Sequence, residues 1–205
     1  MRQLSQHDRE RIRAAVEAAE KRTSGEFVTV LARRSDDYYY IPMLWSALAA
    51  LIIPGLIHWL GWLTETADFY LFQLALFVVL AAVFLAPGVR IRLVPRRLRA
   101  ARAARMAYQQ FVERGVHATR DHSGVLLFVS RAEHYVEILA DAGIHQKVGE
   151  KRWEAIVADF VSEVRAGRTA DGFVTAIEAI GEAMAEHYPR GVTDSNELPD
   201  GLVEI

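Results

Sequence analysis

The stretch GVLLFVSRAEHYVEILA, residues 124–140, decides the fold of this chain. Its first seven residues are mostly apolar and include β-branched and aromatic types, which favours a buried strand. HYVEILA, residues 134–140, follows after only three connecting residues, 131–133. Because so short a connection joins neighbouring antiparallel strands, the stretch predicts a β-hairpin in which Gly124 lies opposite Ala140.

The flanking segments predict one further strand and four helices. EFVTVLARR, residues 26–34, is typical of a strand that is buried on both faces. Apolar residues recur at helical spacing in the segments 5–22, 97–115, 149–165 and 169–187. In the second of these segments, the predicted buried face comprises Leu98, Ala101, Ala104, Tyr108, Phe111 and Val112. A strand, a helix and a strand in one sheet imply a right-handed crossover between parallel strands. We therefore predict a small mixed sheet flanked by helices.

Two uncharged segments interrupt this pattern soon after the first strand. Residues 41–60, IPMLWSALAALIIPGLIHWL, and residues 69–87, FYLFQLALFVVLAAVFLAP, contain no Asp, Glu, Lys or Arg. Twenty helical residues rise about 30 Å, which matches the hydrocarbon thickness of a bilayer. A buried core helix also reaches this length, but two uncharged helices in succession favour an antiparallel transmembrane hairpin.

Charges beside the two segments predict their orientation. Residues 88–105 carry seven arginines, whereas the connecting residues 61–68 carry only the acidic Glu65 and Asp68. The positive-inside rule therefore places both termini of a multi-pass protein in the cytoplasm. Either the arginines only set this topology, or some of them also contact anionic lipid. The candidates for lipid contact are Arg92, Arg96, Arg97 and Arg99.

These patterns divide the chain into four parts. Residues 1–37 and 90–188 are expected to form one cytoplasmic α/β domain, and residues 38–89 the inserted hairpin. Residues 189–205 contain several Pro and Gly residues and are expected to form an extended tail.

The composition and the missing motifs exclude several kinds of site. The chain has 205 residues, a formal net charge of −2 and no cysteine. Without cysteine, a disulfide framework, a thiolate zinc site and a cysteine nucleophile are excluded. The sequence contains no P-loop, nucleophile elbow, zinc-protease motif or dinucleotide fingerprint. We also expect no nucleic-acid partner.

Three segments resemble the TPM domain family, which is also called the TPM phosphatase family. They are LSQHDRERIRAAVEAAEKRTSGEFVTV at residues 4–30, SGVLLFVS with the following strand that ends in ADAGI at residues 123–144, and RAGRTADGFVTAIEAIGE at residues 165–182.

This resemblance implies a three-layer α/β/α sandwich, which the hairpin interrupts here. It also implies an acid phosphatase or calcium-binding activity, or an accessory role in assembly or repair. The best-known members have a C-terminal span, whereas the spans of this chain follow its first strand. The chain therefore resembles a bacterial branch of the family that lies in the inner membrane.

Acidic residues gather at one end of the predicted sheet. Asp121 precedes one strand of the β-hairpin, Asp141 follows the other, and Glu26 begins the parallel strand. With His122 and His145 close by in sequence, these carboxylates are suited to hold Ca²⁺ or Mg²⁺. The alternative is that Asp, Ser and Gly at these positions are ordinary turn residues.

Three hypotheses for function follow. The first is a membrane-anchored binding or accessory module at the cytoplasmic face, whose partners are membrane lipid and another protein. The second is a divalent-metal-dependent phosphatase that uses Glu26, Asp121 and Asp141. The third is a structural membrane organiser that oligomerises through the hairpin. The inserted anchor and the lack of a catalytic motif favour the first hypothesis.

Overall fold

A computed structural model describes residues 4–62, 65–119, 121–191 and 201–205. The chain folds as two compact units. The α/β unit comprises Met1–Ser35 and Arg102–Ile205, and the hairpin unit comprises Asp36–Ala101.

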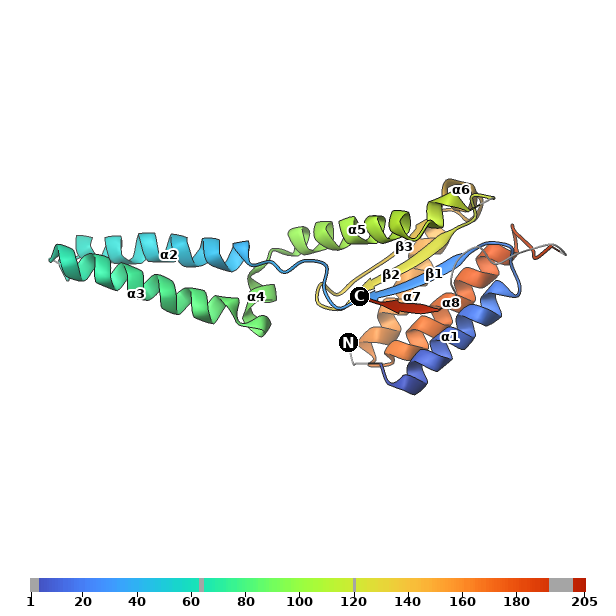
Figure 1. Cartoon of the computed structure of the whole chain (residues 1–205), viewed down its shortest axis with the longest axis horizontal. Helices are drawn as coiled ribbons and strands as arrows, with labels where there is room; N and C mark the ends of the chain where they lie inside the picture. Colours follow the sequence, from blue (N-terminus) through green and yellow to red (C-terminus); the bar gives the residue numbers. More distant parts are fainter. Residues whose placement is uncertain (1–3, 63–64, 120, 192–200) are drawn as a thin grey trace. The chain divides into compact units, whose positions relative to one another are not determined.

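The α/β unit is built around a four-stranded sheet with the strand order β3-β2-β1-β4 (Figure 1). The strands are β1 (Phe27–Ala32), β2 (Val125–Ser130), β3 (Tyr135–Ala140) and β4 (Leu202–Glu204). β1 pairs in parallel with β2 and with β4, and β2 pairs antiparallel with β3. The mixed sheet and the parallel pairing of the first two strands are thus confirmed.

The fourth strand was not expected from the sequence. β4 lies in the predicted extended tail and extends the sheet beside β1, where Thr29 pairs with Leu202. Its three residues are too few to show a strand pattern of their own, so that only pairing with β1 identifies them. Residues 192–200 of the predicted tail lie outside the described residues.

The β2–β3 hairpin differs from the prediction by one residue. Val125, and not Gly124, pairs with Ala140. The strands are connected by residues 131–134, because β3 begins at Tyr135 and not at His134. His134 has a positive φ of 54°, which belongs to a turn and not to a strand.

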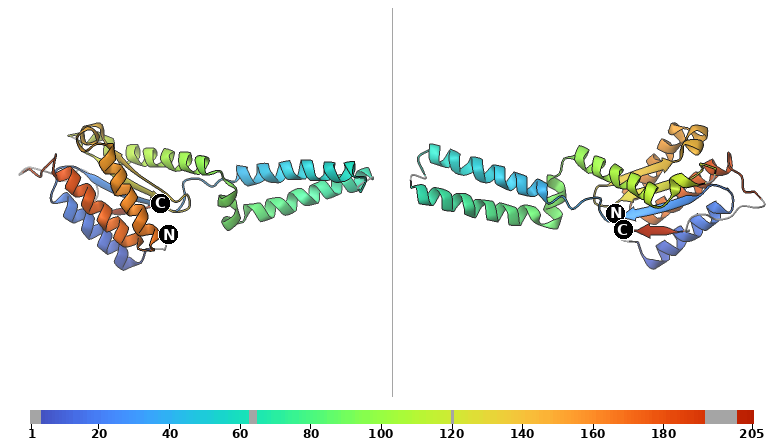
Figure 2. Two further views of the ribbon diagram at one scale, coloured as in Figure 1. Left: turned by 180° about the vertical axis from the view of Figure 1, so that it is seen from behind. Right: turned by 45° about the horizontal axis from the view of Figure 1, so that its top comes forward.

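Helices cover both faces of the sheet, which confirms the three-layer α/β/α arrangement (Figure 2). One layer consists of α1 (Gln6–Glu20), α7 (Glu150–Arg165) and α8 (Thr169–Ala185). The other layer is α5 (Arg96–Glu113), whose first turns belong to the hairpin unit. Two short helices lie next to strands β2 and β3 in the sequence: η1 (Val116–Ala118) precedes β2, and α6 (Ala142–Val148) follows β3.

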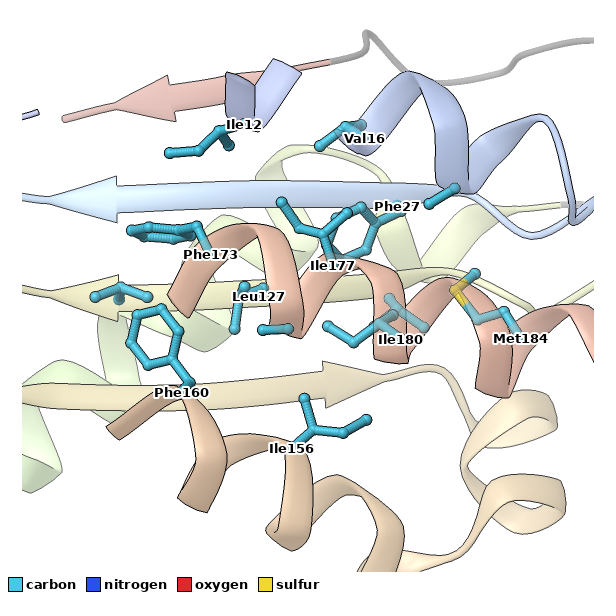
Figure 3. Close-up of a cluster of buried hydrophobic side chains, with 14 of the residues drawn as sticks. Ile12, Val16, Phe27, Leu127, Ile156, Phe160, Phe173, Ile177, Ile180 and Met184 are labelled. Carbon is cyan, nitrogen blue, oxygen red and sulfur yellow. The ribbon is translucent and has the colours of Figure 1, made fainter. Parts of the chain in front are cut away.

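The larger core lies between the sheet and the layer of three helices (Figure 3). Ile12 and Val16 of α1 are fully buried there. The rings of Phe160 and Phe173 meet edge to face, with centroids 5.0 Å apart, and so join α7 to α8. The apolar stripes of these helices are therefore core, as their spacing predicts.

The smaller core beneath α5 uses only part of the predicted helix face, since Phe111 packs against this core but Tyr108 and Val112 do not. Ala103 and Ala107 are fully buried, whereas Tyr108 is 63% and Val112 41% exposed. Many alanines lie along this helix, so its apolar pattern does not define one face. The small alanine side chains face the sheet because they let the helix backbone approach it closely.

The hairpin unit consists of two long antiparallel helices and a short third one. These are α2 (Tyr40–Trp59), α3 (Thr66–Leu85) and α4 (Pro87–Leu93). α2 and α3 lie side by side (Figures 1 and 2). Small side chains are buried along them, among them Ser46, Ala50 and Ala81.

A separate apolar cluster closes the base of the hairpin unit. Tyr38 and Ile41, which precede or begin α2, are buried together with Val94, which follows α4. The Arg90 guanidinium lies 4.4 Å from the centre of the Tyr39 ring, a cation–π arrangement. The two ends of the inserted segment are thus held together, as an insertion into one connection of the α/β fold requires.

Candidate functional site

The acidic end of the sheet, where the sequence predicts a metal site, is assembled differently from the prediction. Glu26 is buried, and its carbonyl oxygen accepts a hydrogen bond from the Val125 amide at 2.9 Å. Asp121 is exposed. The Asp141 carboxylate accepts the Ala142 amide at 2.6 Å and lies 3.1 Å from Nδ1 of His122. Asp141 therefore begins α6 and contacts an imidazole.

The structure gives the predicted Ca²⁺ or Mg²⁺ site no support. In the parts of the chain that the structure describes, no three His, Asp or Glu residues group in a way that could hold a metal ion. The topology does bring the ends of β1, β2 and β3 together, but Asp141 serves as a helix cap and His145 is exposed. Sequence position predicted the shared sheet end but not the direction of each side chain.

Close backbone packing fills this end of the sheet. A Cβ added to Gly124 would lie 2.0 Å from the Val116 carbonyl oxygen, and one added to Gly143 would lie 2.7 Å from that of His122. The Ser123 amide donates to Oγ1 of Thr119 at 3.2 Å. These contacts are those of tightly packed turns, which agrees with the alternative interpretation of the Asp, Ser and Gly residues.

The opposite end of the sheet holds a buried carboxylate that the sequence analysis missed. Glu133, in the β2–β3 turn, is 7% exposed. Its carboxylate accepts the Ser35 amide at 3.0 Å and the Ser130 hydroxyl, and the Ser35 hydroxyl lies 3.1 Å from that of Ser130. Glu133 thereby ties the end of β1, from which the chain continues to the hairpin unit, to the β2–β3 turn.

An arginine-lined pocket of about 90 Å³ lies at this same end of the sheet. It is lined by Leu4, Arg9, Leu31, Arg33, Arg131 and Glu204. We call it the arginine pocket. The Glu204 carboxylate receives two hydrogen bonds from Arg9, at 2.5 and 3.1 Å. Hydrogen bonding to Glu204 raises the pKa of Arg9 further above its usual value.

The parallel pairing of β1 and β2 places two of these arginines next to each other. Ala32 is the register partner of Ser130, and the Arg131 amide donates to the Ala32 carbonyl oxygen at 3.0 Å. The Ala132 amide in turn donates to the carbonyl oxygen of Arg33 at 3.1 Å. The ladder thus continues past both strands, and Arg33 and Arg131 follow them as neighbours.

A register argument would have found this pocket. Arg33 lies near the carboxyl end of the predicted strand 26–34, Arg131 directly follows the predicted strand 124–130, and the carboxyl ends of parallel strands meet at one edge. Glu204 could not have been included, because the sequence did not predict β4.

The four arginines predicted to contact lipid all lie in the hairpin unit. Arg92 is on α4, and Arg96, Arg97 and Arg99 are in the first turn of α5. The first three are exposed, whereas Arg99 is half-buried and its Nε atom is covered without a hydrogen-bond partner. Lipid contact by these residues stays a prediction.

Two helices of the described residues, α2 and α3, are long and apolar enough to cross a membrane. Most of their large apolar side chains do not pack against protein. Leu51, Ile52 and Leu71, for example, are 63%, 62% and 67% exposed. Soluble monomeric proteins rarely leave so large an apolar surface uncovered.

Comparisons with known proteins agree with this fold. Residues 87–183 match the model of the TPM domain. The chain is also similar to the BA42 protein of the psychrophilic bacterium Bizionia argentinensis, whose structure was determined by NMR. The TM-score is 0.62 at 19% sequence identity, and the alignment covers 100% of this chain and 97% of that one. A search of curated proteins gives no match. Residues 87–183, which extend from α4 into α8, therefore match the TPM domain, and the α/β/α architecture of the chain agrees with that match.

Proposed function

We propose that this protein is a membrane-anchored TPM domain that serves as a binding or accessory module at the cytoplasmic face of the bacterial inner membrane. The observation that carries the proposal is the exposed apolar surface of α2 and α3. Leu51 and Leu71 face solvent on helices of 20 residues each, which is the length that a bilayer requires. In a lipid bilayer these apolar side chains contact hydrocarbon and not water, so their exposure carries no free-energy cost.

Charge asymmetry supports a cytoplasmic location for the TPM domain. Arginines follow the second apolar helix, and only acidic residues connect the two helices. We therefore propose that both termini lie inside the cell. Lipid headgroups are proposed to contact the exposed Arg92, Arg96 and Arg97, and a protein partner is proposed to bind the TPM domain.

Two measurements test the anchor and its orientation. The protein should stay in the membrane fraction after a high-salt or alkaline wash, and a variant with residues 38–95 replaced by a Gly/Ser linker of about ten residues should become soluble. A reporter fused at residue 64 should lie outside the membrane and one at Ile205 inside. Extraction of the intact protein by the wash, or the reverse reporter pattern, would contradict the proposal.

The same purified protein distinguishes the binding role from the phosphatase hypothesis. We expect no turnover of an aryl phosphate in the presence of Mg²⁺ or Ca²⁺, and no change in melting temperature with either ion. Turnover that disappears in Asp121→Asn would favour the metal-dependent phosphatase instead.

A groove on the hairpin favours a second candidate function, oligomerisation in the membrane. The groove has a volume of about 460 Å³ and lies between α2 and α3. Its lining combines the small Ala47 and Ala50 with the amide of Gln73. Small residues let helices approach closely in lipid, and Gln side chains hydrogen-bond across helices. A helix of a second copy of this chain suits such a groove.

Crosslinking in native membranes tests this second candidate. We expect a dimer that is lost when Ala50→Leu fills the groove and weakened by Gln73→Leu. Leu71→Ala is the matched control, since Leu71 is on the same helix as Gln73 but is not among the lining residues. Equal crosslinking in all variants would exclude the groove as the contact.

A further inference from the structure

The strand β3 forms one edge of the sheet and leaves one side of its backbone without a partner strand (Figure 1). On the inner side the Asp141 amide donates to the Gly124 carbonyl oxygen at 2.9 Å, and hydrogen-bonded pairs of an antiparallel ladder recur at every second residue. The backbone groups of Val136, Ile138 and Ala140 therefore point away from β2. Within the described part of the chain, no backbone group bonds to them.

The composition of β3 leaves this edge open to pairing. Val136, Ile138 and Ala140 pack toward the larger core, on the side of α7. The single charged residue of the strand is Glu137, and none of its six residues is Lys or Pro. Natural sheets protect their edges with Lys, Pro or bulges, and an edge without them is a template for a further strand.

A pocket of about 160 Å³ lies beside the start of this edge, between β3 and α7. We call it the edge pocket. Its apolar wall is formed by Val136 of β3 and by Phe160, Val161 and Val164 of α7. An apolar cavity of about 150 Å³ holds benzene in another protein, so the edge pocket has room for one Phe or Leu side chain.

The charges around the edge pocket differ between the two faces of β3. His134 and Arg165 also line the pocket, and both are exposed. Neither side chain has a hydrogen bond or an ion pair within the described residues. Glu137 lies on the opposite face of the strand and is half-buried. A carboxylate is therefore favoured at the mouth of the pocket, and a cation is favoured beside Glu137.

We infer that the edge of β3 and the edge pocket bind the carboxyl-terminal segment of a partner protein, which adds an antiparallel strand to the sheet. This inference rests on the proposed binding role and names its partner class. Added strands bind through main-chain hydrogen bonds, and pockets for alternate side chains give specificity.

An antiparallel pairing explains how the same segment uses both features. The end of the partner chain reaches the start of β3, with its last residue opposite Val136. Residues that lie opposite each other share a face of the sheet, so this last side chain enters the edge pocket. Its carboxylate then meets Arg165 and His134. The preceding residue lies opposite Glu137, where Lys or Arg forms a favourable cross-strand pair.

The segments of this chain are poorer occupants of the edge. Its own last strand, β4, already pairs with β1. A second copy of β3, paired about a two-fold axis at Ile138, would place Ala140 opposite Val136. A methyl group does not fill a pocket of about 160 Å³. A separate protein that ends in a large apolar residue fits the edge pocket better.

The first test is fluorescence anisotropy with a labelled synthetic peptide, Gly-Ser-Val-Thr-Val-Lys-Phe, whose carboxyl end is free. The full chain in a non-ionic detergent is titrated into it. We expect saturable binding with a Kd of about 10–100 μM. Amidation of the carboxyl end and Arg165→Gln should each weaken binding about tenfold. In Arg165→Gln, amidation should have little further effect, because the two changes remove the same contact.

Lys151→Gln is the matched control. Lys151 is exposed on the same helix as Arg165 but lies at its other end, and it is not among the residues that line the edge pocket. Both variants lose one positive charge. Lys151→Gln should bind the peptide as the wild type does, and an equal loss in this control would overturn the inference.

Methylated peptides test the main-chain pairing without any change to β3. The amide of the second Val would donate to the Ile138 carbonyl oxygen, whereas the amide of the following Lys would point away from β3. N-methylation of that Val should weaken binding at least tenfold, and N-methylation of the Lys should have little effect. Equal effects of the two methyl groups would contradict strand addition.

Hydrogen exchange locates the bound peptide. Saturating peptide should slow exchange of the outward amides of β3, those of Val136, Ile138 and Ala140. Absence of saturable binding by the wild type would overturn the inference. A dimer that protects these amides without peptide would do so too, because it assigns the edge to a second copy. No arm requires a bilayer, so failed peptide binding leaves the membrane anchor standing, and a failed anchor leaves the peptide result standing.

Discussion

The two units of this protein use the same apolar residue types in opposite ways. In the α/β unit Phe173 and Ile177 are fully buried, whereas in the hairpin unit Leu51 and Ile52 are more than half exposed. A helix of a globular protein hides one apolar stripe against its neighbours, but α2 and α3 are apolar on nearly all sides. Apolar composition therefore does not by itself define a core; the partner surface, either protein or lipid, does.

The largest expected difference between the units comes from removing one apolar side chain in each. Phe173→Ala should lower the free energy of unfolding of the α/β unit by about 3–5 kcal/mol, because it leaves a cavity beside Phe160. Leu51→Ala should change it by less than about 0.5 kcal/mol. Hydrogen exchange of the β1 and β2 amides in detergent measures the change in unfolding free energy for both variants. Similar effects would mean that the hairpin is part of the core.

Glycine positions sharpen the comparison. Gly124→Ala should cost about 3 kcal/mol, since the new Cβ would lie 2.0 Å from the Val116 carbonyl oxygen. Gly55→Ala, in the interior of α2, meets nothing within 4 Å and should be neutral or stabilise the helix by up to about 1 kcal/mol. Calorimetric melting temperatures in detergent test the pair. An unchanged melting temperature for Gly124→Ala would show that the turn after α5, which contains Val116, can shift to make room for the new Cβ at little cost in stability.

A smaller effect distinguishes the two ends of the sheet. Glu133→Ala should cost about 2 kcal/mol, because it leaves the buried Ser130 hydroxyl and the Ser35 amide without their acceptor. Asp121→Ala, at the exposed acidic end, should stay within about 0.5 kcal/mol. Urea denaturation followed by tyrosine and tryptophan fluorescence measures both variants. A larger loss of unfolding free energy for Asp121→Ala than for Glu133→Ala would favour the predicted metal site.

The smallest effect is a pH dependence on the edge strand β3. Burial raises the pKa of Glu137 above its usual value of 4.5, although the Tyr135 hydroxyl donates to it at 2.9 Å. Well below pH 4.5 the carboxyl is protonated in both the folded and the unfolded chain, so its burial does not make stability depend on pH there. As the pH rises past this value, the unfolded state ionises first, so stability falls until the pH reaches the raised pKa.

Glu137→Gln should remove this dependence. The variant should match the wild type in acid and melt slightly higher at neutral pH, with the difference developing above pH 4.5. The side chain is only half-buried, so solvent screening keeps the effect small. Melting temperatures of both proteins across this range test it, and a wild type that becomes more stable as the pH rises would contradict the sign.

The sequence by itself determined the elements that have strong local patterns. The uncharged segments became α2 and α3, the run around Leu127 became a buried strand, and Ser5 with Asp8 forms a capping box at the start of α1. Each of these signals lies within about twenty residues, where periodicity, charge and capping act directly. The resemblance to the TPM domain rests on local segments too, and the family match over residues 87–183 includes two of them, 123–144 and 165–182.

Only the tertiary structure decided the features that depend on distant partners. β4 is a strand because β1 offers it an edge, and α5 buries Ala103 and not Tyr108 because alanine allows a close approach to the sheet. The arginine pocket brings Arg33 beside Arg131, far apart in sequence, through the register of a parallel ladder. Register and side-chain direction are set by packing between segments, which a local pattern does not encode.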